Sequence, residues 1–68
     1  MVKVNLDPIE NFIAEKGWPY TIFCYYCNIS MGTLRKIRKG QYVSFSTAFR
    51  IAINMRHPLS DLIEDMQD

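Results

Sequence analysis

The segment Tyr20–Gly40 has the sequence YTIFCYYCNISMGTLRKIRKG, and its pattern predicts a helix, a tight turn and a second helix. Phe23 and Cys27 lie four residues apart in the first helix, so helical spacing places them on one buried face with Cys24. Asn28 belongs to the few residue types besides glycine that tolerate a left-handed backbone. The first helix is therefore expected to end sharply at Asn28.

The second helix of this segment is expected to begin after Ser30, whose hydroxyl can accept a hydrogen bond from an amide of the first turn. Leu34 and Ile37, three residues apart, anchor the helix to the core, and Gly40 ends it. A rotation of about 100° per residue defines the opposite, outward face. That face carries Gly32, Lys36 and Lys39, with Arg35 beside them and Met31 and Arg38 at its flanks.

The outward face of the second helix is cationic along its length. A run rich in lysine and arginine is more often a solvated helix face than a binding site. The four cations of this helix, however, have no acidic residue at i,i+4 spacing to pair with them, and they repel one another. Solubility alone does not favour such a face. The helix is therefore a candidate reader of DNA.

The distribution of charge along the chain supports the same interpretation. The net charge is only +1, yet all seven acids lie near the two ends: Asp7, Glu10, Glu15, Asp61, Glu64, Asp65 and Asp68. From Lys16 to Ser60 there is no acid, whereas seven cations occur: Lys16, Arg35, Lys36, Arg38, Lys39, Arg50 and Arg56. Part of the surface is therefore expected to be positive and to suit a polyanionic partner.

Length and composition indicate one small globular domain, residues 1–68. Hydrophobic residues make up 49% of the chain and charged residues 22%, as in folded rather than disordered proteins. No apolar run is long enough to span a bilayer, and no signal-peptide pattern is present, so no membrane partner is expected. Two cysteines without secretory context indicate a reducing, cytoplasmic compartment and no disulfide.

The remaining sequence predicts three more helices, giving an all-α bundle of about five short helices with no strand. Asp7 is expected to cap the first helix, with Pro8 at its first position and Gly17 at its end. Ser44 is expected to cap the fourth, whose apolar residues should fill the core: Phe45, Ala48, Phe49, Ala52 and Met55. A fifth, terminal helix is expected from the apolar stripe Leu59, Leu62, Ile63 and Met66.

The whole spacing pattern resembles the Cro/cI-type (xenobiotic-response-element) helix-turn-helix family of phage repressors and related transcriptional regulators. The residues that carry the resemblance are Phe23, Cys24, Asn28, Ile29, Ser30, Leu34, Ile37 and Gly40, followed by Phe45-x-x-x-Phe49-x-Ile51-Ala52 and Pro58–Leu62. In that family the second motif helix enters the major groove and dimers bind twofold-symmetric operators. The resemblance thus implies double-stranded operator DNA as partner, a homodimer on DNA, and a bacterial or phage-infected host cell.

The resemblance also implies a set of DNA-binding residues. Tyr20 starts the first motif helix and is expected to offer its hydroxyl to a phosphate, while Arg35 and Lys36 match base-facing positions. The first base-reading positions fall on Met31 and Gly32, where this chain lacks the polar side chains common in the family. Thr33 lies beside them, and the phosphate-gripping loop is matched by Lys39, Gln41, Tyr42 and Ser44.

Other patterns in the chain do not indicate catalysis, a metal or a cofactor. Cys24 and Cys27 form a C-x-x-C spacing, but a zinc or redox site would need further ligands, and the only histidine is His57. Both cysteines are better explained as small buried hydrophobic residues. The sequence contains no nucleophile–base arrangement, glycine-rich phosphate loop or paired carboxylates, so the protein is not expected to be an enzyme.

Two classes of function remain open from the sequence. The first is a sequence-specific DNA-binding regulator of Cro or repressor type, which the uninterrupted cationic helix face favours. The second is a protein-interaction module on the same fold, such as an antirepressor that binds a partner repressor rather than DNA. The small net charge, the apolar Met31 and side-chain-free Gly32, and the acidic C-terminal segment favour this alternative.

Overall fold

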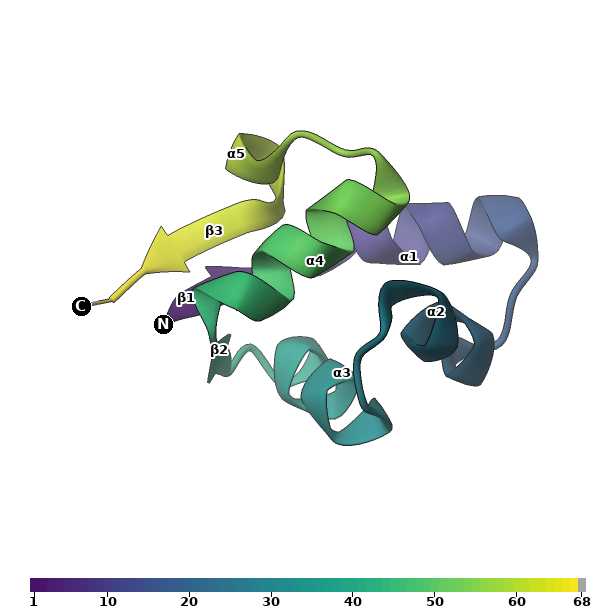
Figure 1. Cartoon of the computed structure of the whole chain (residues 1–68), viewed down its shortest axis with the longest axis horizontal. Coiled ribbons are helices and arrows are strands. Elements are labelled where there is room, and N and C mark those ends of the chain that lie inside the picture. Colours follow the sequence, from purple (N-terminus) through teal and green to yellow (C-terminus); the bar gives the residue numbers. More distant parts are fainter. Residues whose placement is uncertain (68) are drawn as a thin grey trace.

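The computed structural model describes residues 1–67, which form five helices and a three-stranded antiparallel sheet (Figure 1). The helices are α1 (Leu6–Lys16), α2 (Tyr20–Cys27), α3 (Met31–Arg38), α4 (Phe45–Met55) and α5 (Leu59–Leu62). The strands are β1 (Val2–Val4), β2 (Tyr42–Val43) and β3 (Ile63–Met66). Five helices were predicted, but the sheet shows that the all-α class was wrong in part. Asp68, the last residue of the predicted domain, lies outside the described residues.

β1 lies at the centre of the sheet and pairs antiparallel with both neighbours, in the order β2-β1-β3. Val2 and Val4 are 1% and 2% exposed, whereas Lys3 between them points to the other face, as a strand requires. β2 lies in the predicted loop after α3 and pairs Val43 with Val2 and Tyr42 with Lys3. The strands were missed because each spans only two to four residues, too short for a periodic signal.

The predicted terminal helix is wrong beyond its first turn. α5 ends at Leu62, and the chain continues as β3, with Ile63 opposite Val4 and Met66 opposite Val2. The backbone hydrogen bonds offered by β1 outweigh the helical spacing of the apolar residues, so tertiary context overrides the local pattern. Of the predicted stripe, Leu62 is buried, Leu59 and Ile63 are half-buried, and Met66 is exposed.

Most of the predicted helix ends are confirmed. Gly17 is the C-cap of α1 with φ of 69°, and Ser44 caps α4 by accepting a hydrogen bond from the amide of Thr47 at 3.3 Å. The N-cap of α1, however, is Asn5 rather than Asp7. The Asn5 side-chain oxygen accepts a hydrogen bond from the amide of Asp7 at 3.3 Å, so the helix begins one residue before Asp7.

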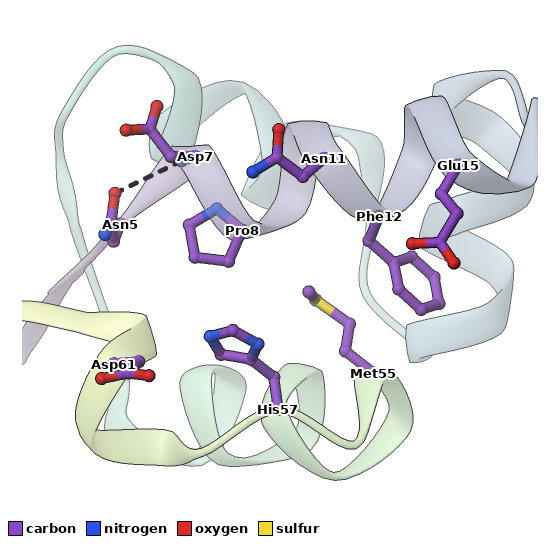
Figure 2. Close-up of a pocket in the computed structure, with 9 residues that line it drawn as sticks. All are labelled: Asn5, Asp7, Pro8, Asn11, Phe12, Glu15, Met55, His57 and Asp61. Atoms are coloured by element: carbon purple, nitrogen blue, oxygen red, sulfur yellow. Dashed lines mark hydrogen bonds between the residues drawn. The ribbon is translucent and has the colours of Figure 1, made fainter.

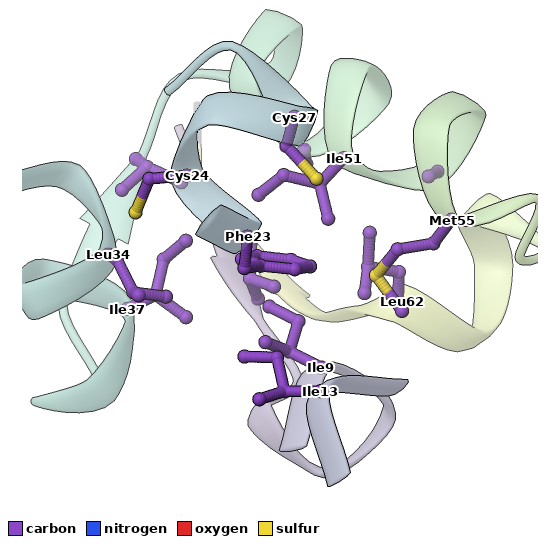
Figure 3. Packing of buried hydrophobic residues seen from close by; sticks show 14 of the residues in the cluster. Ile9, Ile13, Phe23, Cys24, Cys27, Leu34, Ile37, Ile51, Met55 and Leu62 are labelled. Atoms are coloured by element: carbon purple, nitrogen blue, oxygen red, sulfur yellow. The ribbon is translucent and has the colours of Figure 1, made fainter. Parts of the chain in front are cut away.

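The core is centred on Phe23 of α2, whose side chain is fully buried. Figure 3 shows side chains of α1, α3, α4 and α5 gathered around the Phe23 ring. The predicted burial of the α2 and α3 anchors is confirmed for Cys24, Cys27, Leu34 and Ile37. α2 and α3 are therefore fixed to the core through their inner faces, which leaves their outer faces to solvent.

The predicted core role of Phe45 and Phe49 is wrong, because their side chains are 47% and 48% exposed. The buried residues of α4 are Ala48, Ile51, Ala52 and Met55. Because each residue of a helix turns by about 100°, Phe45 and Phe49 both lie on the same side of this buried stripe and away from its centre. Their rings stack with centroids 6.3 Å apart and form an apolar surface on α4.

Candidate nucleic-acid interface

A three-residue turn, Asn28–Ser30, joins α2 to α3. Asn28 adopts the predicted left-handed backbone with φ of 57°, and the next amide, of Ile29, donates to the carbonyl of Cys24 at 2.9 Å. Ser30 caps α3 as predicted, because its Oγ accepts a hydrogen bond from the amide of Thr33 at 3.0 Å. Local hydrogen bonds thus set the path of the chain between the two helices.

Arg50 of α4 holds this turn from outside. Its Nη1 donates a 2.7 Å hydrogen bond to the main-chain carbonyl of Asn28. In the sequence Arg50 was only one of the seven central cations, and no local pattern links it to a carbonyl 22 residues earlier. The contact joins α4, which carries much of the core, to the turn that orients α3.

α3 presents an exposed cationic face. Leu34 and Ile37 are 1% and 2% exposed and hold the inner side of the helix. α3 lies at the lower edge of the molecule in Figure 1. The side chains of Arg35, Lys36, Arg38 and Lys39 are exposed. The structure therefore brings the predicted residues Arg35, Lys36 and Lys39 together on one accessible surface.

The first turn of α3 offers main chain rather than side chains to a partner. Met31 is turned towards α2, with its Sδ 3.4 Å from Sγ of Cys24. The hydroxyl of Thr33 lies 3.0 Å from Ser30 Oγ and belongs to the helix cap. A Cβ added at Gly32 would meet only Ser30 Oγ, at 3.7 Å, so the backbone of Gly32 is open to close approach.

Tyr20, the predicted phosphate donor at the start of α2, is already engaged. Its hydroxyl lies 3.1 and 3.2 Å from the two carboxylate oxygens of Glu10 and donates to that carboxylate. The Arg38 guanidinium lies over the Tyr20 ring, 4.6 Å from its centroid, within the range of a cation–π contact. Tyr20 thus positions a cation at the end of α3 instead of presenting a free hydroxyl.

β2, which follows α3 in the chain, contains a second tyrosine bound to an acid. The Tyr42 hydroxyl donates a hydrogen bond to the Asp65 carboxylate of β3. This bond lowers the pKa of Asp65 and raises the pKa of Tyr42, because it stabilises the ionised carboxylate beside the neutral phenol. Gln41 is exposed, while the exposed Ser44 uses its hydroxyl as the cap of α4.

Lys3 adds a cation that was absent from the predicted interface. The Lys3 Nζ would lie 3.8 Å from a Cβ built at Gly40, so β1 brings this amine to the end of α3. Gly40 itself has φ of 74°, which favours glycine there. The alternation of Val2, Lys3 and Val4 was the available sequence signal that the Lys3 side chain points away from the core.

The two cysteines are packing groups in the structure. Cys24 and Cys27 are 4% and 0% exposed, and burial raises the pKa of both thiols, that of Cys27 to about 12. Both thiols are therefore protonated at neutral pH, which does not suit a metal ligand or a nucleophile. Within residues 1–67, no three side chains of His, Cys, Asp or Glu are grouped so as to hold a metal ion.

A separate cleft lies between α1 and the connection from α4 to α5 (Figure 2). Its volume is about 540 Å³, and Asp7, Glu15 and Asp61 contribute carboxylates to its lining. The Nε2 atom of His57, which also lines the cleft, is buried without a hydrogen-bond partner in the described part of the chain. Carboxylates repel a polyanion, so this cleft is not part of the candidate interface.

Comparison of the chain with family models, with curated proteins and with solved structures found no match. Among the residues that the structure describes, no helix has the length and apolar character needed to cross a membrane. The features of the molecule that bear on its function are therefore the geometry and charge of the surface around α3.

Proposed function

We propose that the protein is a sequence-specific DNA-binding transcriptional regulator of Cro or repressor type, in which α2, the Asn28–Ser30 turn and α3 act as a helix-turn-helix motif. The observation that carries the proposal is the exposed cationic face of α3, opposite the buried Leu34 and Ile37. In this proposal α3 enters the major groove, and Arg35 and Lys36 meet base edges.

The surroundings of α3 supply phosphate contacts in this proposal. The amine of Lys3 lies beside Gly40, the residue that follows the exposed Lys39, so two cations are available to the duplex backbone at this end of the helix. The open main chain at Gly32 lets the start of α3 approach the groove closely. Specificity would then come from the middle of α3, and affinity from both of its ends.

We also propose that two copies bind one operator. A domain this small covers one half-site, and twofold pairing places two recognition helices about 34 Å apart, one turn of the duplex. Phe49 and Ile53 of α4 are 48% and 57% exposed and four residues apart, so they offer an apolar surface for a second copy. Sedimentation that shows a monomer both free and on DNA would contradict this pairing.

A second function is favoured by one observation: carboxylates occupy both tyrosine hydroxyls that were expected to bind phosphate. Glu10 engages Tyr20, and Asp65 engages Tyr42, so acids border the cationic face on two sides. This arrangement suits an interaction module that binds a partner repressor instead of DNA. Such a module would show weak DNA affinity with no sequence preference.

A binding selection from a random duplex library tests the proposal. Fluorescence anisotropy then measures affinity for the selected duplex and for a scrambled duplex, each at about 50 and about 200 mM salt. A regulator enriches one motif, and its affinity falls steeply with salt. Lys36→Glu should abolish enrichment, whereas Glu15→Gln, a change in the separate cleft, should preserve it. A library that stays random, with equal affinity for both duplexes, would favour the interaction module.

A further inference from the structure

β3 has a free edge among the residues that the structure describes, because the sheet order β2-β1-β3 gives it a partner on one side only. Beyond β3, the residues Met1 and Gln67 exchange two backbone hydrogen bonds, of 3.0 and 2.8 Å. Hydrogen-bonded and non-hydrogen-bonded pairs alternate in an antiparallel ladder, so the next pair, Val2 and Met66, is non-hydrogen-bonded. The N–H and C=O of Met66 therefore point away from β1, and the N–H also bonds to the Asp65 carboxylate.

One face of this edge is an apolar ledge. Met66 and Ile63 lie opposite Val2 and Val4, so they share the face of the sheet that is turned to the core. At the edge this face is left open, because the side chain of Met66 is 63% exposed and that of Phe45 is 47% exposed. A groove of about 520 Å³ runs there, with an apolar lining of Phe45, Leu59, Ile63 and Met66.

The polar residues of the same edge are acidic. Glu64 and Asp65 line the groove, and Asp65 lies opposite Lys3, on the face of the sheet away from the core. An extended strand beside β3 would therefore meet apolar groups on one face and a carboxylate on the other. At Asp65 and Met66 the two faces alternate as in a regular β-strand, whereas a bulge at Glu64 brings Ile63 to the same face as Met66.

The acids argue against a second copy as the occupant of this edge. If β3 paired with its own copy about a twofold axis, the register with Ile63 opposite Met66 would place Glu64 opposite Asp65 of the other chain, and the register with Glu64 opposite Met66 would place Asp65 opposite Asp65. Like charges directly opposite each other destabilise a strand pair. The same carboxylates attract a strand that carries lysine or arginine.

We propose that the free edge of β3 and its groove bind an extended segment of another protein, in which apolar residues alternate with lysine or arginine, as an added fourth strand. The C=O of Met66 accepts a main-chain hydrogen bond from the segment, and the apolar side chains of the segment lie on the ledge beside Phe45. Its basic side chains face Asp65. This surface and α3 lie on different sides of α4 in Figure 1, so the inference does not depend on DNA binding.

The test uses a synthetic heptapeptide in which lysine and valine alternate, titrated into the isotope-labelled protein while amide chemical shifts are recorded. The expected shifts lie in β3 and at Phe45, and α3 stays unchanged. A peptide of alternating glutamate and valine, and a lysine–valine peptide with a central proline that lacks the N–H, should each bind about tenfold more weakly or worse.

Variants of the protein complete the test. Met66→Ser and Glu64→Lys should each weaken binding of the lysine–valine peptide by about tenfold. Their matched controls are Tyr25→Ser, which removes an 88% exposed side chain from α2, and Glu15→Lys, which makes the same charge change on α1; both should bind as the parent protein does. Shifts confined to the Asp7–Glu15 region, equal binding of the proline peptide, or self-association through β3 without peptide would overturn the proposal.

Discussion

Arg50 donates a 2.7 Å hydrogen bond from Nη1 to the main-chain carbonyl of Asn28, and this contact ties α4 to the turn before α3. We expect Arg50→Met to lower the free energy of unfolding by about 1 kcal/mol, because the carbonyl loses a charged donor near the surface. The matched control is Arg56→Met, which removes the same charge at the end of α4 and should change stability less. Urea denaturation measures both, and equal losses would contradict a specific role for Arg50.

Substitutions of Lys36 and Lys39 should distinguish contacts to base edges from contacts to phosphates. If Lys36 meets base edges, Lys36→Ala costs about 1–3 kcal/mol on the selected operator and reduces discrimination against a scrambled duplex. Lys39→Ala should weaken binding to every duplex alike and reduce the salt slope by about one unit. Anisotropy on both duplexes decides between these outcomes. Equal losses on the two duplexes for Lys36→Ala would mean that α3 holds DNA without reading it.

Gly32→Ala should raise stability and lower DNA affinity together. Gly32 is helical, and an added Cβ meets only Ser30 Oγ at 3.7 Å, so alanine should stabilise the fold by about 0.5–1 kcal/mol. The same methyl would keep a duplex from the main chain of α3. Gly17→Ala is the control: with φ of 69° it should destabilise by about 1 kcal/mol and leave the affinity of the folded protein unchanged. Undiminished binding by Gly32→Ala would exclude close approach at that point.

Asp65→Asn should strengthen binding to duplexes of any sequence. The Asp65 carboxylate accepts a hydrogen bond from Tyr42, in the segment expected to meet phosphates. The lowered pKa of Asp65 keeps this carboxylate ionised at neutral pH. Removing the charge removes a repulsion of the phosphates, and the gain should shrink as salt rises. Glu15→Gln makes the same charge change in the separate cleft beside α1 and serves as the reference. If the two variants gain affinity equally, the effect is one of net charge and not of position.

The buried thiols predict a loss of stability at alkaline pH. The pKa of Cys27 is raised from 9.0 to about 12 by burial and, to a lesser extent, by the neighbouring Cys24. Above pH 9.0 the unfolded chain releases this proton while the folded chain keeps it, so the free energy of unfolding falls as pH rises towards about 12. Urea denaturation over this range should show a shallower pH dependence for Cys27→Ala. An identical slope for the two proteins would show that Cys27 does not contribute.

Sequence reasoning located α2, the Asn28 turn and α3 because each depends on local chemistry. A left-handed Asn28, a capping Ser30 and apolar residues at helical spacing act within a few residues of one another. The cationic outer face of α3 follows from the same spacing. The sequence alone therefore determined which helix is cationic, and which of its side chains are exposed.

The sheet and the details of the interface could not be obtained in this way. The apolar residues after Leu62 have helical spacing. This segment nevertheless forms a strand, because β1, from the other end of the chain, offers it backbone hydrogen bonds. The predicted burial of Phe45 and Phe49 was wrong because the helices and strands packed against α4 decide which of its faces is buried. These choices depend on contacts between distant segments, which local periodicity does not contain.

The sequence by itself determined the local elements around Asn28 and the segregation of acids from cations along the chain. Only the tertiary structure decided where those charges meet. In the folded chain the hydroxyls of Tyr20 and Tyr42 donate hydrogen bonds to Glu10 and Asp65, and Arg50 donates one to the Asn28 carbonyl. The amine of Lys3 lies beside Gly40. The physical reason is that hydrogen bonds and charge contacts act over a few ångströms in space, while the residues that form them lie 10 to 37 positions apart in the chain.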